Sequence, residues 1–83
     1  MAIYELWIES SLDGKYIGCY NRLPPNKNDT AFATAEMETP QAAAQAMRIQ
    51  LRKALTAADQ LRVRGRINIY DNVNDALEDM LRS

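Results

Sequence analysis

The chain has 83 residues, of which 47% are hydrophobic and 25% charged, with a formal net charge of −1, one cysteine and no histidine. This composition is typical of one small folded domain, residues 1–83, and argues against disorder and against a large catalytic cavity. The near-neutral charge argues against a dedicated sequence-independent nucleic-acid binder, which usually carries a basic excess. Cys19 has no partner for an internal disulfide, and Glu5, Glu9 and the lack of a long apolar run argue against a signal peptide and a transmembrane helix. We therefore expect a cytoplasmic domain that does not enter a membrane.

The first predicted unit is a β-hairpin formed by IYELWIES, residues 3–10, and YIGCYNRL, residues 16–23. The dipeptide Asp-Gly at 13–14 is typical of a two-residue type I′ turn, which would pair Trp7 with Tyr20. Alternation then predicts one core face and one outward face. The expected core residues are Tyr4, Leu6, Ile8, Ile17 and Cys19. The expected outward residues are Glu5, Trp7, Glu9, Tyr16, Tyr20 and Arg22.

A loop, PPNKND at residues 24–29, leads to a predicted third strand, TAFATAEME at residues 30–38. Two assignments of this strand's faces are open. In one, Phe32 and its alternate neighbours point outward, and the core side is lined by Ala31, Ala33, Ala35 and Met37. In the other, Phe32 is buried.

Thr39 and Pro40 predict the N-cap and first residue of a long helix that extends to about Asp59. Its apolar stripe comprises Pro40, Ala43, Ala44, Met47, Leu51, Ala54, Leu55 and Ala58, with Gln45, Arg48 and Arg52 opposite. A basic edge is formed by Arg48, Arg52 and Lys53. A solvated helix face is the simplest interpretation, but an exposed Ile49 beside this edge could serve a dimer or partner contact.

The next stretch, RVRGRINIY at residues 62–70, predicts a fourth strand with one buried and one wet face. Its buried residues would be Val63, Ile67 and Ile69, and Gly65 could mark a bulge. The final DNVNDALEDMLRS predicts a short amphipathic helix capped by Asn72 or Asn74, and its buried side would be Val73, Ala76, Leu77, Met80 and Leu81. The predicted class is α+β: a small antiparallel sheet in β-β-β-α-β-α order, one long helix packed on one face, and a short C-terminal helix.

The sheet face away from the long helix is the candidate binding surface, because tryptophan, tyrosine and arginine are the residues that make interface hot spots. Its predicted partner-binding residues are Trp7, Tyr16, Tyr20, Arg62, Arg64, Arg66, Tyr70, Glu5 and Glu9. The leading contacts are Trp7, Tyr20, Arg64 and Arg66. Three interpretations are open: a self-contained solvated face with arginines over the rings, a protein interface, or a platform on which nucleic-acid bases stack.

Catalysis is not expected, because a chain without histidine lacks the commonest general base and the commonest metal ligand. Cys19 has no histidine to activate it, and the acidic residues near the C-terminus lack the spacing of a calcium loop. No phosphate-binding glycine pattern is present. The sequence therefore predicts a non-enzyme with no metal and no cofactor.

The hairpin, the strand TAFATAEME, the helix TPQAAAQAMRIQLRKAL and the strand RINIYDN together resemble the β-β-β-α-β layout of small HicB-like domains and of some small phage-encoded anti-CRISPR proteins. The resemblance covers about residues 3–72, and the helix DALEDMLRS is additional. It implies a non-enzymatic domain that inhibits or regulates a larger complex by covering one of its surfaces. The expected partner is a protein or ribonucleoprotein complex, and the chain is expected to be a monomer or homodimer. The alternative is a nucleic-acid-binding or antitoxin-like regulator that uses the same face, and a third possibility is a structural or oligomerising module.

Overall fold

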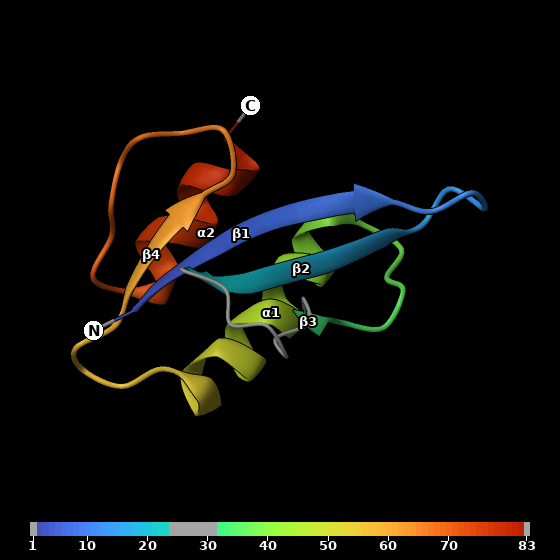
Figure 1. The fold of residues 1–83 in the computed structure, drawn as a ribbon. Coiled ribbons are helices and arrows are strands. Elements are labelled where there is room, and N and C mark those ends of the chain that lie inside the picture. The colour runs from blue at the N-terminus through green and yellow to red at the C-terminus, as the bar shows by residue number, and fades with distance from the viewer. Residues whose placement is uncertain (1, 24–31, 83) are drawn as a thin grey trace.

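The computed structural model describes residues 2–23 and 32–82 of the chain (Figure 1). Its elements are β1 (Ile3–Ser10), β2 (Tyr16–Leu23), β3 (Phe32–Ala33), α1 (Pro40–Ala54), β4 (Gln60–Val63) and α2 (Val73–Leu81). The predicted α+β class and the order β-β-β-α-β-α are confirmed. The predicted loop at 24–29 and the first two residues of the predicted third strand lie outside the described residues.

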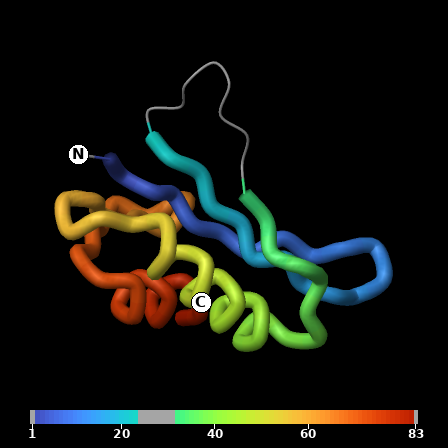
Figure 2. The backbone as a smooth tube through the Cα atoms, turned by 90° about the horizontal axis from the view of Figure 1, so that it is seen from below, coloured from blue at the N-terminus to red at the C-terminus, as the bar shows by residue number. Residues whose placement is uncertain are grey.

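The four strands form one sheet in the order β3-β2-β1-β4. Neighbours β1, β2 and β3 are antiparallel, whereas β4 lies parallel to β1, so the sheet is mixed rather than wholly antiparallel as expected. The reason is the connection: β3 and β4 run in the same direction, and α1 carries the chain from one edge of the sheet to the other. Figure 2 shows α1 and α2 on the same side of the sheet, which leaves the opposite side without a helix.

The β1–β2 turn differs from the prediction and shifts the hairpin register by one residue. The Ser11 N–H donates to the Lys15 carbonyl at 2.8 Å, and the Gly14 N–H donates to the Ser11 carbonyl at 3.2 Å. Gly14 has a φ of 79°, so the loop is a type I turn followed by a left-handed glycine rather than a two-residue turn. Trp7 therefore lies opposite Cys19 instead of Tyr20.

This shift exchanges the two faces of β2, because alternate residues of a strand point to opposite sides. Tyr20, predicted on the outward face, faces the helices and is only 4% exposed. Cys19 is buried as predicted, with 5% exposure, but it lies on the opposite face beside Trp7. Both face assignments were wrong for the same reason, the length of the loop.

The third strand is shorter than predicted, and neither assignment holds in full, because Phe32 faces the helix side but is not buried. Phe32 pairs with Tyr20, and the two rings stack with centroids 5.1 Å apart. Phe32 remains 54% exposed because β3 is the edge strand. Beyond it, Thr34 is buried, with its hydroxyl accepting from the Gly18 N–H at 3.0 Å.

Helix α1 begins as predicted, with the Thr39 hydroxyl accepting from the Ala42 N–H at 3.0 Å and Pro40 in the first turn. Its buried residues are Ala43, Ala44, Met47 and Leu51. Gly18 of β2 allows a close approach of this helix, since a Cβ there would lie 2.3 Å from the Met47 Cγ. The helix ends at Ala54 rather than near Asp59, because Asp59 forms a local turn in which its carboxylate accepts from the Thr56 N–H at 2.9 Å.

Strand β4 ends at Val63 because the chain turns back on itself there. The Arg66 N–H donates to the Val63 carbonyl at 3.0 Å, and Gly65 has a φ of 83°, as a type II turn requires. The returning chain pairs with β4 through Tyr70 and Leu61.

Two residues predicted to be buried in this stretch are therefore exposed. Ile67 is 91% exposed and Ile69 is 43% exposed, because residues 64–69 form a turn and a returning segment rather than a continuing strand. Gly65, predicted as a bulge, belongs to the turn.

Helix α2 is capped by Asn72, whose side chain accepts from the Asp75 N–H at 2.9 Å. It packs Val73, Ala76 and Leu77 into the core cluster, as predicted. Leu81, predicted on the buried side, is exposed at the end of the helix. Within the described part of the chain, neither helix combines the length and the apolar character that crossing a membrane requires.

Candidate protein-binding surface

The sheet face opposite the helices, here called the outer face, carries a group of charged side chains around the single tryptophan. We call this group the Trp7 cluster; it comprises Glu5, Trp7, Glu9, Arg62 and Arg64. β1 supplies the first three from alternate positions, β4 supplies Arg62, and Arg64 follows the end of β4.

The parallel pairing of β4 with β1 brings the cluster together. Glu5 lies directly beside Arg62 in the register, and the Arg64 N–H donates to the Leu6 carbonyl at 2.8 Å. The Glu5 carboxylate therefore lies between two guanidinium groups. Its Oε1 accepts from Arg64 Nε at 2.9 Å, and its Oε2 accepts from Arg62 Nη2 at 3.3 Å.

Arg64 lies flat against the tryptophan. Its Cζ is 3.5 Å from the centroid of the Trp7 ring, well within the range of a cation–π interaction. The Trp7 ring is held in place as well, because its indole Nε1–H donates to a Glu9 carboxylate oxygen at 2.9 Å. Ring and guanidinium are thus each held by a carboxylate.

The cluster has no net charge, because two arginines and two glutamates cancel. The Arg64 guanidinium is nonetheless accessible to a partner, because the Arg64 side chain is 51% exposed, whereas the Glu5 side chain that holds it is only 16% exposed. The Arg62 Nε atom is buried and has no hydrogen-bond partner among the described residues. The cluster thus offers a neutral but strongly polar surface around one aromatic ring.

Two side chains of β2 lie beside the cluster on this side of the sheet. Ile17 lies beside Glu9, and Cys19 lies beside Trp7. Burial raises the pKa of the Cys19 thiol, the nearby Glu9 raises it further, and Arg64 opposes both. The thiol is therefore protonated at neutral pH, which does not suit a nucleophile.

Four of the nine predicted site residues lie elsewhere. Tyr16 lines a pocket on the helix side together with residues of α1 and α2. Tyr20 is in the core, where burial is the main factor that raises its pKa, and Tyr70 packs against the core. Arg66 donates to the buried Asp79 carboxylate at 2.8 Å and to the carbonyl at the end of α2.

The sequence reasoning did not place Ile17 and Cys19 on the outer-face side of the sheet, where Cys19 is nevertheless buried. The only signal that could have revealed them is Ser11, since its hydroxyl accepts from the Lys15 N–H at 3.1 Å and supports the longer loop. Ile69, predicted to be buried, is also exposed, because Gly65 belongs to a turn and not to a bulge within a continuing strand.

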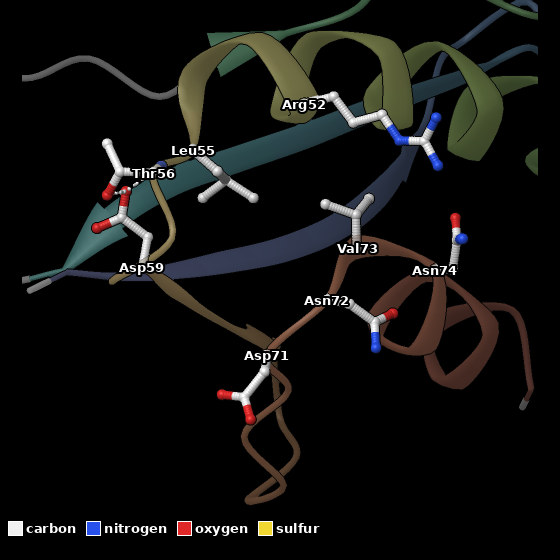
Figure 3. A pocket seen from close by; sticks show the side chains of 8 residues that line it. All are labelled: Arg52, Leu55, Thr56, Asp59, Asp71, Asn72, Val73 and Asn74. Atoms are coloured by element: carbon white, nitrogen blue, oxygen red, sulfur yellow. Dashed lines mark hydrogen bonds between the residues drawn. The ribbon is translucent and has the colours of Figure 1, made fainter.

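The described residues contain no group of three potential metal-ligating side chains of the histidine, cysteine or carboxylate type. The hollows of the surface are open and lie on the helix side or at its ends. One of about 300 Å³ separates the end of α1 from the start of α2 (Figure 3). Comparisons with protein-family models, with curated proteins and with solved structures gave no significant match.

Proposed function

We propose that this chain is a non-enzymatic protein-binding module that contacts its partner through the outer face, with Trp7 and Arg64 at the centre of the contact. The observation that carries the proposal is the Arg64 guanidinium held 3.5 Å above the Trp7 ring and fixed by Glu5. Tryptophan and arginine are the commonest hot-spot residues of protein interfaces. Groups already held in place lose less conformational freedom on binding.

The position of the tyrosines favours a protein partner over a nucleic acid. A stacking platform needs several open aromatic rings, but Tyr20 is buried and Tyr16 lies on the helix side. The one aromatic ring of the Trp7 cluster is covered on one side by Arg64. The neutral charge of the Trp7 cluster also does not suit a surface that collects phosphates.

The more specific role that we propose is inhibition or regulation of a larger complex, which could be a bacterial defence complex countered by a phage. This role is supported by the resemblance in layout to HicB-like and anti-CRISPR proteins. The unpaired Cys19 fits action in a reducing cytoplasm.

The test is affinity capture of the tagged chain from a bacterial lysate treated with nuclease, followed by identification of the retained proteins. Trp7→Ala and Arg64→Ala should each reduce capture at least ~10-fold, the scale of a single hot-spot residue. Arg22→Ala is the matched control, because Arg22 is an exposed arginine of the same sheet on the helix side. Capture that depends entirely on nucleic acid, or that both outer-face variants leave unchanged, would overturn the proposal.

A further inference from the structure

The outward surface of α1 and α2 carries a charge pattern that has no part in the contact proposed for the outer face. The two helices are antiparallel neighbours: the end of α1 and the start of α2 line one pocket, and the start of α1 and the end of α2 line another. Between them runs an open groove of about 350 Å³, with Ala44, Leu77 and Leu81 as its apolar lining. Ile49, 53% exposed, lies on the outward side of α1 beside this groove.

Positive charge gathers on α1 and negative charge on α2. Arg48, Arg52 and Lys53 belong to the last two turns of α1, and none of them forms an ion pair with another described residue. Asp75 and Glu78 are exposed residues of α2, where Glu78 pairs with Arg82 at 3.0 Å in an ion pair open to solvent, and Asp71 lies just before its first turn. Figure 3 shows that Arg52 and the residues that begin α2 face the same hollow. The basic end of one helix therefore lies next to the acidic start of the other.

We propose that two copies of the chain form a symmetric dimer through this helix surface, with the two-fold axis along the groove. Rotation about that axis places α1 of one copy over α2 of the other. Arg48 and Arg52 lie level with the first turns of α2, and rotation about an axis along the groove keeps each residue at its level. The rotated copy therefore brings Arg48 and Arg52 over the partner's Asp75 and Glu78. The symmetry repeats the same contact on the other side of the axis.

A second copy fits this surface better than an unrelated partner does, because the surface is self-complementary. A wholly acidic partner would be repelled by α2, and a wholly basic one by α1, since opposed like charges suppress wrong partners. A standard interface covers about 800 Å² per partner, roughly a seventh of the 5423 Å² surface of the chain. The outer face lies on the opposite side of the molecule, so a dimer of this kind leaves the Trp7 cluster free.

The test uses charge-reversed variants of the whole chain in sedimentation equilibrium. The wild type should dimerise, and the dimer should weaken as salt rises, because its contacts are exposed ion pairs. Arg48→Glu with Arg52→Glu should raise the dimer dissociation constant at least ~10-fold, and so should Asp75→Lys with Glu78→Lys. Mixing these two double variants should restore association as a heterodimer. Far-UV circular dichroism verifies that both are folded.

Two control variants separate this surface from the outer face. Arg22→Glu and Trp7→Ala should both dimerise like the wild type, since Arg22 belongs to β2 and Trp7 to β1, and neither lies on the outward surface of α1 and α2. A wild type that stays monomeric at low salt, a dimer that Trp7→Ala abolishes, or folded double variants that do not associate on mixing would each overturn the proposal. None of these results bears on capture of a different protein through Trp7, so the two proposals fail separately.

Discussion

Truncation of Tyr20 should destabilise the fold much more than truncation of Trp7, although sequence reasoning placed both rings on the same outward face. Tyr20 is 4% exposed and stacks on Phe32 with centroids 5.1 Å apart. Removal of a buried aromatic side chain costs about 3–5 kcal/mol. Trp7 is half-buried on an open face, where loss of its cation–π contact and of part of its apolar burial costs about 1–2 kcal/mol.

The measurement is the free energy of urea unfolding of Tyr20→Ala and Trp7→Ala, monitored by far-UV circular dichroism at one temperature. The expected gap of about 2 kcal/mol corresponds to roughly 8 °C or more in melting temperature for a domain of this size. Because small domains have only about 5–15 kcal/mol of stability, Tyr20→Leu provides a milder variant if Tyr20→Ala does not fold. A Trp7→Ala variant that is destabilised as much as Tyr20→Ala, or more than Tyr20→Leu, would refute the placement of the two rings on opposite faces of the sheet.

Three further predictions concern the packing of the helices and the turn before β4. Gly18→Ala should cost about 1–3 kcal/mol, because the added methyl group meets Met47 2.3 Å away; an unchanged thermal melt would show that α1 does not pack this closely. Arg66→Ala should cost about 1–2 kcal/mol and speed amide exchange across α2, since it leaves the buried Asp79 carboxylate unpaired; unchanged protection would contradict this role. The pKa of Asp59 lies below its ordinary 3.8, mainly because its carboxylate accepts a hydrogen bond from the Thr56 N–H. The ionised carboxylate therefore stabilises the fold fully above pH 3.8, and this stabilisation is lost as the pH falls through the lower pKa of the folded state. Acid titrations of stability should thus be shallower for Asp59→Asn, and identical acid titrations of the two proteins would exclude this effect.

The parts of the fold that follow from local chemistry were predictable. Thr39 caps α1 and Asn72 caps α2, because each side chain accepts from a backbone N–H of the first turn, and Pro40 suits the first helical position. The order of the elements follows from these signals and from strand alternation.

The errors arose where one loop residue decides the face of a whole strand. The Asp13-Gly14 pair was read as a two-residue turn, but Ser11 closes a longer loop, and the one-residue shift exchanged Cys19 and Tyr20. Gly65 likewise suits either a bulge or a turn, and only the tertiary pairing of Tyr70 with Leu61 decides between them.

The candidate site was predictable only in part, for the same physical reason. Glu5 and Trp7 come from a strand whose alternation was correctly read, and Arg62 continues the pattern in β4. The contact between Arg64 and Trp7 depends on the parallel placement of β4 beside β1, which no local feature of the sequence specifies.

The most direct test of the proposed binding surface is the signal of the Trp7 indole N–H in a ¹H–¹⁵N spectrum. The chain has one tryptophan, so this spectrum contains one indole resonance, and its proton is donated to Glu9 in the free protein. On addition of the partner retained after nuclease treatment, we predict that the indole signal shifts or broadens while the Arg22 amide is unaffected. A partner that binds but leaves the indole signal unchanged would show that the outer face is not the contact.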